Sequence, residues 1–235
     1  MKKFLLVAVA VLAASATTLG LRQVVVSASI ARSTGKFQGC GQAGSGGDFI
    51  LNALKNRDRP GDEALGMTLD QVRDAPFPLA LSQGEKDRAR WSPAALEEIV
   101  PWEDRYALIE GYLIFEKKMG KESCNCDSAT NVDWHLNLDS QPRRLEAGKP
   151  VLRDSMVVEV SPRTLAKHPS WSLATLRNFV RDGTRVRIKG WLLWDQEHHE
   201  QLQASAGADA KRATLWEIHP VHAIEYWDGN AWRVH

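Results

Sequence analysis

The sequence predicts a mainly β fold in which five strands close into a barrel, with helical additions before it and within it. Three observations lead to this prediction. Five segments after Trp102 are rich in strand-forming residues, one helical pattern lies between the third and the fourth of them, and the 48–101 region before them combines helical patterns with turn residues. Short apolar or alternating segments separated by turn residues are typical of small barrels.

Two helices are expected before the strands. Asp48 is a suitable N-cap for a helix over 49–57, whose apolar residues form one stripe. Ser92 is the expected cap of a shorter helix over 93–100. We therefore expect 48–101 to be an irregular helical segment that packs on the barrel.

The five strands and one further helix follow in order. The strands are expected at 106–117, 132–138, 156–160, 184–194 and 213–226. Gly111 and Gly190 lie inside the first and the fourth strand, where strands of a small barrel bend sharply. The fifth is expected to break near Pro220, because proline has no amide hydrogen for a ladder bond. Ser172 and the apolar stripe after it predict a helix over 172–181.

The order of three strands, a helix and two strands resembles the OB fold, a five-stranded Greek-key barrel, over about 102–235. In that fold the second, third and fifth strands are neighbours. Four blocks of the sequence also resemble a family of uncharacterised secreted bacterial proteins: 122–126, 133–136, 157–163 and 215–221. The resemblance implies this architecture for a secreted protein and implies no activity, because a fold alone does not determine a reaction.

The N-terminus has the pattern of a secretory signal. Residues 1–16 combine a short cationic start, the apolar run 4–13 and the small residues Ala14-Ser15-Ala16 that a signal peptidase accepts. We expect export to the periplasm or beyond the cell. The alternative is an uncleaved inner-membrane anchor, because 4–21 is uncharged and approaches the ~18 apolar residues that begin to span a bilayer. No further membrane span is expected.

Three cysteines follow the signal, and an oxidising compartment favours a disulfide between two of them. A bond from Cys40 to Cys124 or to Cys126 would tether the N-terminal region, whereas a Cys124–Cys126 bond would close a small, strained ring. The 17–47 segment has the Gly- and Ser-rich composition of a flexible linker, and it is expected to move unless Cys40 holds it.

Polar residues alternate with apolar ones on the second, third and fifth strands. The candidates for one shared outer face are Asp133, His135 and Asn137, then Glu159, then Glu217 and His219. His135 and His219 are candidate metal ligands, and the three carboxylates of the set are candidate catalytic groups or ligands. The alternative is a solvated polar face, as on most barrels.

Other candidates lie outside this set. Asn137, Arg163, His198 and His199 are candidate ligand-binding residues, the two histidines in the loop between the fourth and fifth strands. Cys124-x-Cys126 followed by Asp133-x-His135 also has the residue types of a thiolate–imidazole zinc site, with a disulfide as the competing interpretation.

Three functions fit this pattern. The first is an exported OB-fold binding module for a small molecule, an oligomer or a protein. The second is a metal-dependent hydrolase, nuclease-like in its residue types, in which His135 and His219 hold a divalent metal ion. The third is an envelope interaction protein without a catalytic site. Lys and Arg number 30 against 29 Asp and Glu, so the chain lacks the basic surface that nucleic-acid binding requires.

Overall fold

The computed structural model describes residues 32–78, 81, 85–202 and 206–235. The expected signal at 1–16, with its anchoring alternative, lies outside the described residues. Within those ranges, no helix is long and apolar enough to cross a membrane.

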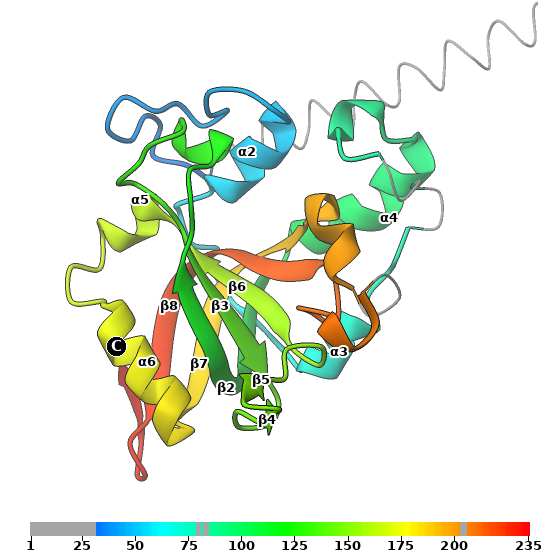
Figure 1. Ribbon diagram of the computed structural model, residues 1–235. Helices are drawn as coiled ribbons and strands as arrows, with labels where there is room; N and C mark the ends of the chain where they lie inside the picture. The colour runs from blue at the N-terminus through cyan, green and yellow to red at the C-terminus, as the bar shows by residue number, and fades with distance from the viewer. Residues whose placement is uncertain (1–31, 79–80, 82–84, 203–205) are drawn as a thin grey trace, which may run out of the picture.

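Five strands form a closed barrel (Figure 1). In their spatial order they are β2 (Tyr106–Lys118), β3 (Trp134–Asp139), β6 (Met156–Val160), β8 (Trp216–Trp227) and β7 (Arg185–Trp194). β7 pairs back with β2, which closes the ring. All neighbours are antiparallel except β6 and β8, which are parallel. The predicted OB-like barrel is confirmed. The second, third and fifth barrel strands in chain order, β3, β6 and β8, lie side by side.

The remaining elements extend or cover this barrel. The α-helices are α2 (Phe49–Lys55), α3 (Leu69–Arg73), α4 (Pro93–Glu103), α5 (Pro162–Leu165) and α6 (Leu173–Asp182). The added strands are β1 (Leu65–Met67) beside β2, β9 (Trp232–Val234) beside β8, and the hairpin of β4 (Leu145–Glu146) and β5 (Lys149–Pro150). Short 3₁₀ helices are η1 (Arg88–Arg90), η2 (Ser123–Asn125), η3 (Gln196–Gln201) and η4 (Gly207–Asp209).

The expected helix caps are present. Asp48, Ser92 and Ser172 each accept a hydrogen bond from a backbone amide in the first turn of α2, α4 and α6. Such a bond satisfies one of the free amides at a helix start, which is why these boundaries could be read from sequence.

One expectation about the strands is wrong. β8 does not break near Pro220 but continues through a cis His219–Pro220 peptide bond. The register between β7 and β8 is irregular on either side of Gly190, and Pro220 has no partner residue in it. Because the ladder skips this position, the missing amide hydrogen of proline removes no strand–strand bond.

Apolar side chains fill the barrel, while the helical segment packs on its outside. Leu136, Val158 and Ile218 face the interior and are fully buried. On the outside, the guanidinium of Arg88 donates two hydrogen bonds of 2.9 and 2.7 Å to the carboxylate of Glu103 at the end of α4. Both side chains are buried, and Glu103 also accepts a 3.0 Å hydrogen bond from the backbone N–H of Trp194 at the end of β7.

Residues 32–47, which we call the strap, cross the outside of the barrel before α2. In Figure 1 the strap and α2 lie above the barrel, and α6 lies lower. The predicted disulfide is confirmed and joins Cys40 to Cys126, with 5.7 Å between their Cα atoms. Arg163 at α5 donates hydrogen bonds to the carbonyl oxygens of Gly35 (2.5 Å) and Cys40 (3.0 Å). Cys40 thus holds the strap against the barrel.

Candidate functional site

Five of the predicted polar residues meet on the outer face of β3, β6 and β8. The register places His135 opposite Glu159, and their side chains are joined by a 2.9 Å contact between Nδ1 and Oε1. The other oxygen of Glu159 lies 3.2 Å from Nδ1 of His219. That nitrogen is also 3.3 Å from Oε1 of Glu217. The alternation of polar residues along three adjacent strands therefore places these groups together, as predicted.

This polar face is buried, so the alternative of a solvated surface is wrong. The exposed fractions range from 0% to 9%: Asp133 0%, His135 9%, Glu159 2%, Glu217 0% and His219 0%. The cover consists of α2 and the loop from β2 to β3, which contains η2. Strand periodicity shows which side chains share a face, but it does not show what covers that face.

Several members of the cluster come from this cover and from distant loops. Lys55 of α2 lies 3.7 Å from Asp195 and 3.8 Å from Glu122. Arg212 pairs with Glu217 at 3.2 Å, and neither side chain is exposed. Sequence reasoning missed Lys55, Glu122, Asp195 and Arg212. The signal that could have indicated them is Lys55, a lysine on the buried side of α2, because a buried lysine requires an acidic partner.

The imidazole of His219 is surrounded by carboxylates. Burial lowers its pKa, but the hydrogen bond with Glu217 and the charges of Glu159 and Asp133 outweigh burial and raise the pKa to about 9. Burial raises the pKa of Asp133 to about 7, against the opposing effect of the His219 charge. The protonation of each group therefore depends on the charge of the other, and a bound cation would change both.

The other charged groups are held ionised or neutral by their neighbours. Burial acts to raise the pKa of Glu159, yet the hydrogen bond with His135 and the charge of His219 hold that pKa well below its usual range. Burial acts to lower the pKa of Lys55, but Asp195 and other acids raise it well above its usual value. Burial and the charge of Asp133 raise the pKa of the Cys124 thiol.

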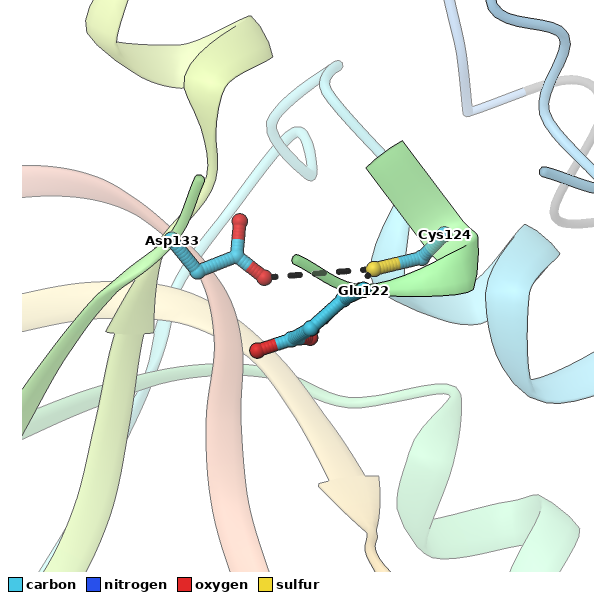
Figure 2. A group of neighbouring side chains, drawn as sticks. All are labelled: Glu122, Cys124 and Asp133. Atoms are coloured by element: carbon cyan, nitrogen blue, oxygen red, sulfur yellow. Dashed lines mark hydrogen bonds between the residues drawn. The ribbon is translucent and has the colours of Figure 1, made fainter. Parts of the chain in front are cut away.

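One oxygen of Asp133 lies near two other candidate metal-ligand atoms. Its Oδ2 atom is 3.7 Å from Nε2 of His219 and 3.9 Å from Sγ of Cys124. Its other oxygen accepts a 3.0 Å hydrogen bond from the side-chain amide of Asn125, which fixes the carboxylate. Figure 2 shows the sulfur of Cys124 directed toward the carboxylates of Asp133 and Glu122.

The two ring nitrogens of His219 have different surroundings. Nδ1 faces Glu159 and Glu217, whereas Nε2 is buried without a hydrogen-bond partner among the described residues. Within that part of the chain, two groups of three residues bring ligand atoms close together, and both contain Asp133: Glu122, Cys124 and Asp133, then Asp133, Glu159 and His219. His135 belongs to neither group, and Cys124 and His219 each share a group with Asp133 but not with each other.

A pocket connects this cluster to the surface. Its volume is about 300 Å³, and its lining includes Lys55, Glu122 and Cys124 together with Lys121 and His198. Glu122 is partly exposed, with 21% of its side chain accessible. A small ion or molecule therefore has a route to the thiol side of the cluster.

The predicted ligand-binding residues lie in different places. Asn137 is buried and donates to Ser155 Oγ (2.8 Å) and to the Lys211 carbonyl (3.0 Å). Arg163 holds the strap, as described above. His198 lines the pocket, with its Nδ1 2.9 Å from the amide nitrogen of Gln201, whereas His199 is buried with its ring centre 6.1 Å from that of Phe77. Of these four residues, His198 is the one that borders the pocket.

Comparison with protein-family models, with curated proteins and with solved structures found no match to this chain.

Proposed function

We propose that this chain is an exported OB-barrel protein that binds a divalent metal ion, zinc first, through Cys124, Asp133 and His219. One observation supports this most. Nε2 of His219 is completely buried, has no hydrogen-bond partner among the described residues, and lies 3.7 Å from a carboxylate oxygen of Asp133. A buried polar atom without a partner is costly, and a bound cation would remove that cost.

Two of the three distances between the proposed ligand atoms are close to those of a zinc site. Tetrahedral zinc, with bonds of about 2.0–2.3 Å to oxygen, nitrogen and sulfur, separates its ligand atoms by about 3.3–3.5 Å. The observed separations from Asp133 Oδ2 are 3.7 Å to His219 and 3.9 Å to Cys124. Both separations exceed the zinc values by a few tenths of an ångström. Among the described residues, however, Cys124 and His219 share no group of ligand atoms within 4.8 Å, so the ion would have to draw these two residues together around Asp133.

The surroundings of His219 match those of a metal-binding imidazole. A histidine that binds metal through one nitrogen usually donates its other N–H to a carboxylate, which fixes the ring. In this protein Nδ1 of His219 lies 3.2 Å from Glu159 and 3.3 Å from Glu217. His135, which the sequence suggested as a metal ligand, instead contacts Glu159. It therefore orients the carboxylate that in turn orients His219.

The charge of the cluster also favours a cation. Three cations, Lys55, Arg212 and the protonated ring of His219, face a larger set of acids: Glu122, Asp133, Glu159, Asp195 and Glu217. A divalent ion would offset this excess in a buried environment, where charges interact strongly. Zinc would replace the protons on Cys124 and on Nε2 of His219, so binding should release protons.

Export is supported by two features of different kinds. Residues 1–16 have the pattern of a secretory signal. The Cys40–Cys126 disulfide is of a kind that persists mainly in oxidising compartments. We propose that the protein works in the periplasm or outside the cell.

The pocket favours a second candidate function, metal-dependent hydrolysis. Catalytic zinc sites have three protein ligands and leave a fourth position for water. The pocket reaches Cys124, and Glu122 lies beside it with its Oε2 atom 3.5 Å from the sulfur. In this alternative Glu122 would accept a proton from the attacking water.

Elemental analysis of the purified protein, before and after chelation, tests the proposal. We expect about one zinc per chain, with thermal unfolding shifted upward, because zinc at 100 times its Kd stabilises the folded state by about 2.7 kcal/mol. Cobalt in the same site should give a sulfur-to-metal charge-transfer band. Cys124→Ser should abolish that band and weaken zinc binding.

His135→Gln is the matched control, because it removes an imidazole outside the proposed ligand set while the glutamine amide can still donate a hydrogen bond to Glu159. It should keep the zinc stoichiometry and the cobalt band. Loss of zinc in His135→Gln but not in Cys124→Ser would show that His135 and His219, and not Cys124, bind the ion. Absence of zinc, with melting unaffected by chelator, would refute metal binding. Hydrolysis of an activated ester by the zinc-loaded protein, lost in Glu122→Gln, would support the second candidate.

A further inference from the structure

The loop that carries Cys124 is held in place by the strap. Cys40 of the strap is bonded to Cys126, two residues after Cys124. The amide of Ser45 donates a 2.9 Å hydrogen bond to the carbonyl of Ser123. Just after α2, the side chain of Asn56 donates one of the same length to the carbonyl of Cys124. The residues on both sides of the proposed sulfur ligand are therefore tied to the N-terminal part of the chain.

The backbone of this loop adopts a conformation that few residues favour. Cys126 and Asp127 have φ angles of 53° and 54°, in the left-handed region. For residues other than glycine this region is sterically unfavourable, although Asp tolerates it better than most. Beside the backbone hydrogen bonds within the loop, two contacts oppose its relaxation: the disulfide at Cys126, and the 2.5 Å hydrogen bond from Ser45 Oγ to Asp127. Both contacts come from the strap.

The position of the sulfur depends on this conformation. Cys124 lies in η2, and the helix ends at Cys126, its left-handed C-cap. Sγ of Cys124 is 3.9 Å from Oδ2 of Asp133, a separation close to that required by a shared ion. Relaxation at residues 126 and 127 would turn η2 and move the sulfur away from Asp133, which directly precedes β3 and accepts a 2.8 Å backbone hydrogen bond from Met119.

We propose that the Cys40–Cys126 disulfide is a redox latch on the metal site, an inference that rests on the proposed function. The oxidised chain holds Cys124 in position to bind the ion, and reduction of the disulfide lowers the affinity for it. A dithiol in the same compartment is the reductant: one of its thiolates attacks a sulfur of the disulfide and displaces one protein thiolate, and its second thiol attacks the resulting mixed disulfide and displaces the other. The products are two protein thiols and one oxidised dithiol.

The experiment compares zinc affinity, by competition with a chromophoric chelator, in the oxidised chain and in Cys40→Ser/Cys126→Ser. The double variant removes the latch without adding a reductant that itself binds zinc. We expect its affinity to fall at least tenfold and its Cys124 thiol to react with a maleimide, because the thiol is only 2% exposed in the latched chain. Circular dichroism checks that the barrel is retained.

Asn131→Ala is the control, because it removes a strap contact, the 2.8 Å bond to Gln38, that does not involve residues 122–127. It should leave zinc affinity unchanged. Equal affinity and equal protection of Cys124 in the double variant and the oxidised chain would overturn the latch while leaving metal binding intact. Higher affinity in the wild-type chain after reduction would also overturn it, since the freed thiols would then be ligands. If the oxidised chain binds no zinc, the proposed function itself fails.

Discussion

Acid is expected to destabilise this protein through His222, a buried residue of β8 that holds the end of the α2 segment. Its Nε2 atom lies 2.8 Å from the carbonyl oxygen of Arg57, so this nitrogen carries the proton of the neutral ring. Its Nδ1 atom is buried and has no hydrogen-bond partner within the described part of the chain. A second proton would therefore sit on an atom with no acceptor.

The surroundings of His222 disfavour the charged ring. Burial, reinforced by the positive charges of Lys167 and Arg57, lowers its pKa to about 4, while the bond to the Arg57 carbonyl and the charge of Asp58 oppose the shift. The unfolded chain has the ordinary value of about 6.5. Between these two values the unfolded state binds a proton that the folded state does not, so stability falls as pH falls.

The magnitude follows from the two pKa values. The contribution is almost fully present at about pH 7, declines as the pH drops below about 6.5, and levels off below about 4. A difference of about 2.5 pKa units corresponds to a loss of about 3 kcal/mol by about pH 4. This is a large part of the 5–15 kcal/mol that typically stabilises a domain, as an order of magnitude.

Urea unfolding at a series of pH values measures this loss, and His222→Gln isolates it. Glutamine retains a donor for the Arg57 carbonyl but does not titrate, so the variant should lose about 3 kcal/mol less than the wild type between about pH 7 and about pH 4. Other groups titrate equally in both proteins and cancel in the comparison. Parallel pH profiles for the two proteins would refute the reasoning, because His222 would then have an ordinary pKa when folded.

Two further predictions concern packing on the barrel. Arg88→Met should lower the free energy of unfolding in urea by about 3–5 kcal/mol, because it leaves the buried carboxylate of Glu103 without its cationic partner. The double variant with Glu103→Leu should recover most of that loss. Additive losses in the double variant would contradict this. Gly190→Ala should lower stability by about 1–3 kcal/mol, since the new methyl group would lie 2.3 Å from Cγ2 of Ile218. Gly66→Ala is the control and should leave stability nearly unchanged, because no atom lies within 4 Å of its new methyl group. Equal melting temperatures for the two glycine variants would contradict the prediction, because the strands would then adjust freely.

The barrel was predictable because its evidence is local. Alternation over 132–138 assigns Leu136 to the interior and His135 to the outside, and the caps Asp48 and Ser172 mark helix starts. The continuity of β8 was not predictable. It depends on a register irregularity opposite Pro220, and such an irregularity is a property of two paired strands.

The candidate site was predictable only in part, for a related reason. Strand order and period 2 bring His135, Glu159 and His219 together, and the structure confirms that arrangement. The proximity of Cys124 to Asp133 depends on the path of a loop and on which cysteine pairs with Cys40, and neither is encoded in a local pattern. Burial of the cluster results from segments tens of residues away.

The burial of so many charges is difficult to explain by stability alone. Bringing ionised groups out of water costs several kcal/mol for each, and replacing buried ion pairs with apolar side chains of similar volume is often neutral or stabilising. β6 illustrates the alternative, because Val157 lies on the same strand face as Glu159 and is equally buried. A barrel covered by α2 would therefore fold with valine or leucine at these positions. A cluster that costs folding free energy, exceeds its cations in carboxylates and leaves an imidazole nitrogen without a partner is better explained by a bound cation than by the needs of the fold.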